Sequence, residues 1–326
     1  MRGGGVMSTQ PHVIAPPGHA SFALDVAEYL QRTPRQLPSR YFYDALGSAL
    51  FDAICRLPWY RVTRSETALL ARHAREILAS LPRPLNIAEL GCGNGEKLAV
   101  LLEKGGERLR RVHLIDISPA ALLSARARLA ALSATPVTTC HGTYEEGLAR
   151  LATHRSSGAW LMLFLGSNIG NFDPPAARDM LRRIHGSLAE GDSLLLGSDL
   201  IKPARDLQLA YDDPLQVTAA FNRNLLRRVN DELGGTFDLD GFSHRAVWNP
   251  AERRVEMHLV STRRQLVRVA AVDLEIMFER DEWIWTESSY KYDPDAVLQA
   301  GHAAGFRDGE QWIDEDAGFA LTRFHV

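Results

Sequence analysis

The segment Leu85-Asn-Ile-Ala-Glu-Leu-Gly-Cys-Gly-Asn-Gly-Glu-Lys-Leu-Ala-Val-Leu-Leu102 decides the fold class. It begins with a short apolar run typical of a buried strand, and leucines recur at helical spacing from Glu96 onward. Between them, Gly91, Gly93 and Gly95 allow a sharp turn and a close approach of a ligand to main-chain N–H groups. The segment therefore predicts a strand, a glycine turn and a helix.

The same alternation of strands and helices continues along the chain. Strands are expected at 112–116, 160–165 and 192–198, and helices at 119–132 and 174–188. An earlier helix, 67–78, is expected to start from a capping box formed by Thr63 and Glu66. The run 160–165 is apolar throughout, as in a parallel strand buried on both faces. Together these segments predict an α/β protein with a doubly wound sheet.

The pattern changes after residue 200. A long helix is expected at 206–232, followed by alternating strand segments at 255–260 and 267–272. A helix at 293–304 and a strand at 319–324 are expected to return to the first sheet. The predicted parts are a disordered leader at 1–20, a first domain at 61–200 plus 292–326, and a second domain at 21–60 plus 201–291.

Composition excludes several classes of partner. The formal net charge of -3 provides no basic surface for nucleic acid or an anionic membrane, so a small molecule is the expected partner. Cys55, Cys92 and Cys140 are an odd number without CxxC spacing, which argues for a reducing compartment and against disulfides. We expect a cytoplasmic protein that is a monomer and holds no metal.

The glycine spacing and one acidic residue narrow the choice of cofactor. The turn has the spacing GxGxG, whereas the dinucleotide fingerprint requires a glycine where Glu96 stands. Asp116 ends the second strand, about 20 residues beyond Gly95, where a carboxylate can accept hydrogen bonds from ribose hydroxyls. Its alternative role is to cap the helix at 119, although Ser118 is better placed. These features favour S-adenosylmethionine, and a cationic group of that cofactor would explain the acidic Glu89 in a buried strand.

A polar loop follows the strand at 160–165. It reads Gly166-Ser-Asn-Ile-Gly-Asn171, and in a parallel sheet this edge lies beside the cofactor turn. The loop is therefore a candidate substrate site. An ordinary Gly/Asn-rich turn is an equally good explanation of these residues alone.

The chain resembles the histidine-specific methyltransferases that make hercynine, the trimethylated betaine of histidine, on the way to ergothioneine. The resemblance covers nearly the whole chain after the leader. The segments that carry it are Tyr41-Phe-Tyr43-Asp44, Gly47-Ser48, Leu57-Pro58-Trp-Tyr60, Thr63-Arg64-Ser-Glu66, Glu89-Leu-Gly91, Glu96-Lys97, Phe164-Leu-Gly166-Ser-Asn-Ile-Gly170-Asn171, Tyr211-Asp-Asp213, Thr218-Ala-Ala-Phe-Asn-Arg-Asn224, Glu256-Met257 and Thr286-Glu287-Ser-Ser289.

The resemblance implies a class I, Rossmann-like methyltransferase sheet with an inserted α+β substrate-binding domain. It implies that Tyr60, Asn171 and Tyr211 hold the α-amino and α-carboxylate groups and act in catalysis. It further implies that Glu287 and Ser289 bind the imidazole, with Tyr43 beside it and Met257 packed around the ring. From the residues alone, Glu287 is more simply a surface strand charge beside Lys291.

The cofactor residues that we expect are Glu89, Gly91, Gly93, Lys97, Asp116, Thr143, Tyr144 and Gly166. Thr143 stands where the family often has an acidic residue near the adenine, and its hydroxyl would partly substitute for that acceptor. Asn94-Gly95 also departs from the family pattern.

Three functions follow as hypotheses. The first is S-adenosylmethionine-dependent Nα-trimethylation of L-histidine, which needs positioning and desolvation rather than a strong base. The second is methylation of another amino acid or of a histidine derivative. The third is a non-catalytic homologue that only binds ligand.

Overall fold

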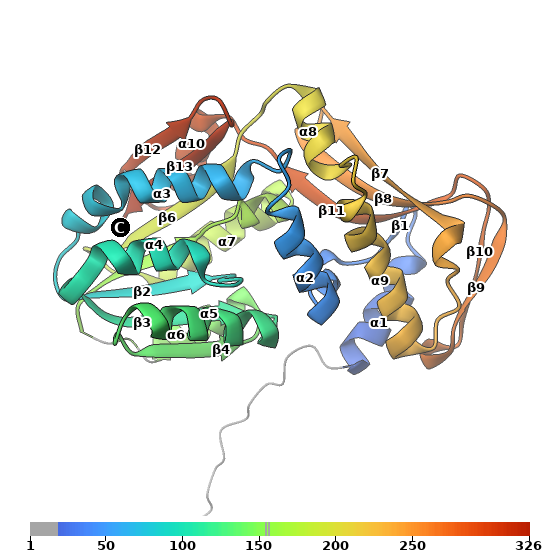
Figure 1. The fold of residues 1–326 in the computed structure, drawn as a ribbon, viewed down its shortest axis with the longest axis horizontal. Helices are drawn as coiled ribbons and strands as arrows, with labels where there is room; N and C mark the ends of the chain where they lie inside the picture. Colours follow the sequence, from blue (N-terminus) through green and yellow to red (C-terminus); the bar gives the residue numbers. More distant parts are fainter. Residues whose placement is uncertain (1–18, 154, 156) are drawn as a thin grey trace, which may run out of the picture.

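The computed structural model describes residues 19–153, 155 and 157–326. These residues form a seven-stranded sheet, a four-stranded sheet and a two-stranded hairpin, and Figure 1 shows the two larger sheets on opposite sides of the molecule. Most of the expected leader lies outside the described residues. Its last two residues, His19 and Ala20, belong to helix α1 (His19–Leu30).

The seven-stranded sheet has the order β12-β13-β6-β5-β2-β3-β4. Its strands are β2 (Leu85–Leu90), β3 (Leu109–Asp116), β4 (Val137–His141), β5 (Ala159–Phe164), β6 (Ser193–Asp199), β12 (Gly309–Asp314) and β13 (Phe319–His325). Strands β2 to β6 run parallel, and β13 pairs antiparallel with β6. The sheet is therefore doubly wound, as predicted, and β2 is the middle one of its five parallel strands.

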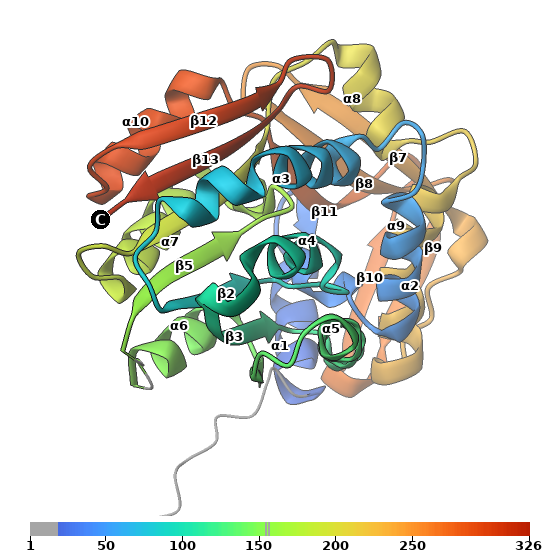
Figure 2. The ribbon, with the colours of Figure 1, turned by 60° about the vertical axis from the view of Figure 1, so that its left-hand side comes forward.

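Helices cover both faces of this sheet (Figure 2). One face carries α3 (Val62–Ala79), α4 (Glu96–Gly105) and α5 (Pro119–Leu132), and the other carries α6 (Tyr144–Thr153), α7 (Pro174–Ser187) and α10 (Pro294–Ala304). Adjacent residues of β2 show the division, because Ile87 packs in the core of the first face and Ala88 in that of the second. The parallel strands β2, β5 and β6 are buried along their whole length for this reason.

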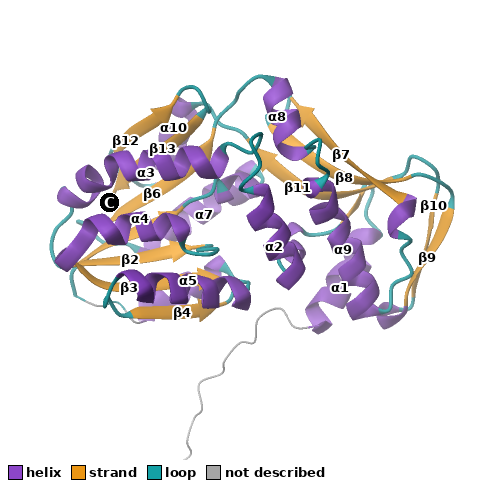
Figure 3. Cartoon of the chain, in the orientation of Figure 1, coloured by secondary structure: helices purple, strands orange, loops and turns teal. Residues whose placement is uncertain are grey.

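The four-stranded sheet has the order β1-β11-β8-β7, and helices pack on one of its faces (Figure 3). Its strands are β1 (Arg35–Gln36), β7 (Phe242–Asn249), β8 (Arg254–Ser261) and β11 (Trp283–Tyr290), and the separate hairpin is β9 (Gln265–Val269) with β10 (Leu274–Phe278). The remaining helices are α1, α2 (Ala45–Ile54), α8 (Ala204–Tyr211) and α9 (Val217–Leu233). Short 3-10 turns occur at Ser39–Phe42, Gly106–Arg108, Asn168–Asn171, Leu239–Gly241 and Ala270–Val272.

The single helix predicted at 206–232 is wrong. Residues 212–216 separate α8 from α9. Pro214 disfavours helical backbone at the residue before it, and the Asp213 carboxylate accepts hydrogen bonds from the N–H groups of Leu215, Val217 and Thr218. A new helix therefore starts here.

The predicted capping box at Thr63 is also wrong. Helix α3 begins at Val62, so Thr63 already lies in its first turn, and Glu66 contacts another part of the molecule. A box of this kind occurs elsewhere: Thr143 Oγ1 accepts from Glu146 N (3.3 Å), and Glu146 Oε2 accepts from Thr143 N (2.7 Å). It starts α6, a helix that we had not predicted.

The strands of each sheet cluster in sequence. The seven-stranded sheet uses residues from 85–199 and 309–325, and the four-stranded sheet uses 35–36 and 242–290. We propose 61–200 plus 292–326 and 21–60 plus 201–291 as the limits of two domains on this basis. No helix within the described ranges has the length and apolar character required to cross a membrane.

Candidate active site

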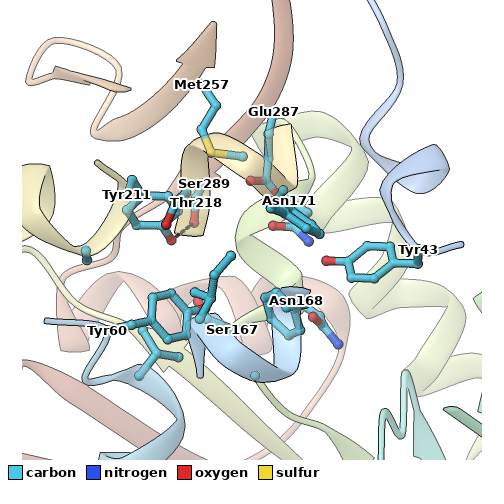
Figure 4. A pocket seen from close by; sticks show the side chains of 16 residues that line it. Tyr43, Tyr60, Ser167, Asn168, Asn171, Tyr211, Thr218, Met257, Glu287 and Ser289 are labelled. Carbon is cyan, nitrogen blue, oxygen red and sulfur yellow. Dashed lines mark hydrogen bonds between the residues drawn. The ribbon is translucent and has the colours of Figure 1, made fainter. Parts of the chain in front are cut away.

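A pocket lies between the two larger sheets (Figure 4). Its empty volume is about 530 Å³, and part of this space is open to solvent. It is lined by Tyr43, Phe51, Ile54, Tyr60, Val62, Gly166, Ser167, Asn168, Asn171, Ala210, Tyr211, Thr218, Phe221, Met257, Glu287 and Ser289. All seven side chains predicted to contact the amino acid are among them.

A β-bulge in β11 brings two of these side chains to the pocket. Ile284 pairs with Leu259 on the buried face, and Trp285 pairs with His258 on the other face. Regular alternation would place Glu287 on the same face as Trp285. The register shifts between these two residues, so Glu287 pairs with Met257 on the pocket face.

Thr286 holds the bulge in place. Its side chain is buried, and its hydroxyl Oγ1 lies 2.7 Å from Asn222 Oδ1 and 3.0 Å from the main-chain oxygen of Met257. The indole of Trp285 donates to the Glu287 main-chain oxygen across the same irregularity (2.9 Å). Ser289 follows Glu287 on the pocket face after one intervening residue.

Glu287 is not a surface charge paired with Lys291. It is partly exposed at the pocket wall, where desolvation raises the pKa of its carboxyl to about 7. Lys291 is buried and forms its ion pair with Asp199 instead (2.8 Å). A carboxylate in this position can accept a hydrogen bond from a ring N–H of a ligand, and the nearby Ser289 hydroxyl can bond a second polar atom of that ligand.

The other side of the pocket is aromatic. The rings of Tyr60 and Tyr211 meet edge to face with centroids 6.2 Å apart, and Phe51 lies 6.3 Å from Tyr60 and 5.7 Å from Tyr43. Burial raises the pKa of Tyr60 and Tyr211, so both phenols stay neutral. Asn171 comes from the loop after β5, and in Figure 4 its amide lies beside the same space.

The glycine turn has the geometry that its sequence predicts. Gly91, Gly93 and Gly95 all have positive φ, at 75°, 52° and 74°. A Cβ on Gly91 would lie 2.7 Å from Asn168 Nδ2, whereas one on Gly93 would meet nothing within 4 Å. The turn is therefore crowded at Gly91, next to the pocket, and open at Gly93.

Asp116, the last residue of β3, connects the glycine turn to the residues that follow β3 through hydrogen bonds. Its carboxylate accepts from Gly93 N (2.9 Å) and from Ser118 N (2.8 Å), and burial raises its pKa. Ser118 is the residue that caps α5, because its side chain accepts a hydrogen bond from Ala121 N. The simple capping role considered for Asp116 thus belongs to Ser118, and the Asp116 carboxylate lies at the open side of the glycine turn.

Glu89 provides the test of whether this site suits a cationic cofactor. Its side chain is buried, and within the described residues its Oε2 atom has no hydrogen-bond partner. Desolvation raises its pKa to about 8. A ligand carrying a sulfonium and an ammonium group, bound over Gly93, would supply the missing charge. The residues therefore fit S-adenosylmethionine.

Lys97 and Gly166 meet at a third acidic side chain. Glu66 is fully buried, forms an ion pair with Lys97 Nζ (2.6 Å) and accepts from Gly166 N (2.8 and 2.9 Å). It links α3, α4 and the loop after β5. Burial alone would lower the pKa of Lys97, but the Glu66 carboxylate raises it, so the ammonium stays charged.

Thr143 and Tyr144 lie at the start of α6. The Thr143 hydroxyl accepts a hydrogen bond from Glu146 N in the capping box. This contact leaves it less able to act as the hydrogen-bond acceptor expected near the adenine. The Tyr144 ring packs on Phe164, and its hydroxyl oxygen would be 3.1 Å from a Cβ on Gly91. Tyr144 therefore borders the glycine turn directly.

Several pocket and network residues were not predicted from the sequence. They are Phe51, Ile54, Val62, Ala210, Thr218, Phe221, Asp199 and Lys291, whereas Ser167 and Asn168 belong to the loop predicted as a candidate substrate site. Asp199 could have been found from the sequence, because it is an acidic residue at the end of a buried parallel strand, as Asp116 is. The apolar residues carry no such signal, since core residues have the same composition.

Comparisons with known proteins identify sequences that are similar to this chain. The family model described as "Histidine-specific methyltransferase, SAM-dependent" matches residues 22–326. The histidine N-alpha-methyltransferases of Mycobacterium tuberculosis and Mycolicibacterium smegmatis are each 42% identical, over 97% and 91% of this chain and 98% and 92% of theirs. The ergothioneine biosynthesis protein 1 of Schizosaccharomyces pombe is 34% identical over 66% of this chain and 29% of its own length.

Proposed function

The chain belongs to the SAM-dependent, histidine-specific methyltransferase family, and from that premise we propose that it converts L-histidine to hercynine by three Nα-methylations. Hercynine is the precursor that the ergothioneine pathway requires, and a relative named for that pathway is similar to part of this chain. The observation that carries the proposal is that Glu287 and Ser289 face a pocket bordering the cofactor turn, together with Tyr60, Asn171 and Tyr211.

The polar groups of the pocket match the two ends of histidine. Glu287 accepts a ring N–H and Ser289 contacts the other ring nitrogen, while Met257 and Tyr43 pack beside the ring. An apolar side chain would leave Glu287 and Ser289 without partners, which is the kind of mismatch that gives strong discrimination. Tyr60, Asn171 and Tyr211 bind the α-amino and α-carboxylate groups.

S-adenosylmethionine supplies a methyl group already activated on a sulfonium. The residues that would hold it are Glu89, Gly91, Gly93, Lys97, Asp116, Thr143, Tyr144 and Gly166. Among them, Asp116 has the carboxylate oxygens for ribose hydroxyls, and Glu89 and Lys97 carry the charges that complement the cationic and anionic ends of the amino acid moiety.

The protein's own contribution is orientation rather than base catalysis. Tyr60 and Tyr211 are neutral phenols, because burial raises their pKa, so neither is a strong base. They and Asn171 orient the amine lone pair after the α-ammonium has lost its proton to solvent. The aromatic wall also tolerates the permanent positive charge of the trimethylated product through cation–π attraction.

We also propose that the enzyme acts as a cytoplasmic monomer. Every side chain assigned to the amino acid comes from one copy of the chain, so the site needs no second copy. Light scattering on the purified protein measures the oligomeric state, and a stable dimer at micromolar concentration would contradict the proposed monomer.

The assay that tests the reaction is incubation with S-adenosylmethionine and each amino acid in turn, followed by product masses. We expect mono-, di- and trimethylated products from L-histidine and none from the other amino acids. Product from a different amino acid alone would favour the second hypothesis. No product from any amino acid or histidine derivative, with cofactor still bound, would leave only the non-catalytic one.

A further inference from the structure

Lys291 lies directly behind the pocket, where the ends of the two sheets meet. It follows β11, and Asp199, its ion-pair partner, is the last residue of β6. The Lys291 side chain is completely buried. The mechanism above makes no use of this charge.

All three N–H groups of the Lys291 ammonium have partners. Nζ lies 2.8 Å from Asp199 Oδ2, 2.8 Å from the Tyr211 hydroxyl and 2.7 Å from Ser289 Oγ. An ammonium has three donors and no acceptor. Lys291 therefore cannot reach a bound amino acid, but it donates to two residues that line the pocket.

These hydrogen bonds set the polarity of both hydroxyls. Tyr211 donates its hydrogen to Ser289 Oγ at 2.7 Å, the contact drawn in Figure 4. Ser289 Oγ thus accepts from Lys291 and from Tyr211, which uses both of its lone pairs. Its own hydrogen is the only group left for a ligand, and Tyr211 retains only an acceptor lone pair.

We propose, building on the function proposed above, that Lys291 is a positioning residue that makes Ser289 a hydrogen-bond donor and Tyr211 an acceptor toward the substrate. With Glu287 as the acceptor on the other side, the pocket then selects a neutral ring that has one N–H and one unprotonated nitrogen. Tyr211 accepts an N–H of the substrate amine. Lys291 thereby determines which tautomer of the ring binds.

The second cation at Asp199 provides a matched control. Lys202 Nζ pairs with Asp199 Oδ1 at 2.6 Å and donates to the main-chain oxygen of Ala317. It has the same charge and the same carboxylate partner as Lys291, but among the described residues it makes no hydrogen bond with Tyr211 or Ser289. If histidine affinity fell only because Asp199 had lost a cationic partner, substitution of Lys202 would lower the affinity as much as substitution of Lys291.

The test is a double-mutant cycle on the affinity for L-histidine, measured by calorimetry with the full chain. We expect Ser289→Ala and Lys291→Met each to raise the Kd about tenfold, because the first removes the hydroxyl that donates to the ring and the second removes the contact that fixes the direction of that hydroxyl. The double variant should be no more than about threefold weaker than the weaker single variant, because both single variants lose the Ser289 hydrogen bond to the ring and only the effect of Lys291 on Tyr211 is added. Lys202→Met should change the Kd less than about twofold.

The role of Lys291 would be overturned if the increases in Kd of the two single variants multiplied in the double variant. It would also be overturned if Lys202→Met raised the Kd as much as Lys291→Met. If Lys291→Met does not fold, as judged by thermal unfolding, Lys291→Gln takes its place in the cycle under the same criteria. Failure of the wild-type protein to bind L-histidine would instead refute the proposed function. A wild-type protein that binds histidine, combined with a failed cycle, refutes only the inference about Lys291.

Discussion

At the scale of single residues, the site is built around buried charge. Glu89, Glu66 and Asp199 are acidic residues buried around the site, and two of them have a lysine partner within 2.8 Å. Within the part of the chain that the structure describes, Glu89 has no such ion pair, and desolvation raises its pKa to about 8. Of the three, Glu89 is therefore the one whose charge state most depends on a ligand.

The first prediction concerns the stability of the ligand-free protein. Because the pKa of Glu89 rises from 4.5 to about 8 on folding, the folded state holds more protons than the unfolded state between these values. Its contribution to stability is fully present below pH 4.5 and is lost as the pH rises through 8. Glu89→Gln should remove this loss, so the variant should be more stable than wild type at pH 8.5 by on the order of 5 kcal/mol.

Urea unfolding at pH 5 and pH 8.5 measures the effect. The difference in free energy of unfolding between variant and wild type should grow with pH. The same variant should bind S-adenosylmethionine more weakly, because the carboxylate that faces its cationic group is gone. An unchanged pH dependence would show that Glu89 is already ionised in the ligand-free protein.

Glu287 provides a second prediction at this scale. Glu287→Ala should lower kcat/KM for L-histidine by roughly 10- to 150-fold. This factor corresponds to the free energy that one hydrogen bond to a charged group contributes. Affinity for S-adenosylmethionine should change little, because Glu287 lines the pocket and is not one of the cofactor residues. Equal losses in histidine use and cofactor affinity would contradict separate sites for the two ligands.

At the scale of elements, the bulge in β11 is the feature with the largest consequence. It reverses the direction of the side chains that follow it, so Glu287 and Ser289 face the pocket while Trp285 faces away. A one-residue change of register moves every later side chain to the opposite face of a strand. The position of the bulge therefore determines whether the site exists.

Thr286→Val should loosen this bulge without removing it. Valine keeps the volume but loses the hydroxyl contacts with Asn222 and the Met257 main-chain oxygen. We expect KM for L-histidine to rise about threefold to tenfold, in line with the cost of buried hydrogen bonds, with cofactor affinity nearly unchanged. Ser288→Ala is the control, because Ser288 pairs with Glu256 on the other face. Equal effects of the two variants would rule out a special role for the bulge.

At the scale of the whole molecule, the pocket depends on contacts between the two sheets. The ion pair of Asp199 with Lys291 joins the end of β6 to the end of β11, and the Ser48 and Ser118 hydroxyls meet 3.2 Å apart between α2 and α5. Pocket residues come from both sides of this junction. A bound amino acid adds contacts to both sides at once.

Binding should therefore stabilise the whole chain against unfolding. At a free L-histidine concentration about 100 times the Kd, the free energy of unfolding should rise by about 2.7 kcal/mol, as expected for a ligand that binds only the folded state. Chemical unfolding with and without L-histidine measures this. L-leucine at the same concentration is the control, and equal stabilisation by both amino acids would argue against a histidine pocket.

The local features of this protein were determined by its sequence. The strand, glycine turn and helix from Leu85 to Gly105 form as predicted, because positive φ at alternate glycines and regular apolar spacing are properties of neighbouring residues. The doubly wound sheet follows from the repetition of such units. The family resemblance selected Glu287 and Ser289 as binding residues, but strand alternation gave no sign of the face on which they lie.

Only the tertiary structure decided which charged side chains pair with one another in the site. Glu66 was expected to cap its own helix and instead pairs with Lys97 and Gly166, while Lys291 was considered as a partner for Glu287 and instead pairs with Asp199. These partners lie tens of residues apart in the chain. A buried charge takes whatever partner the packing of distant elements brings within hydrogen-bond distance, and no local pattern encodes that choice.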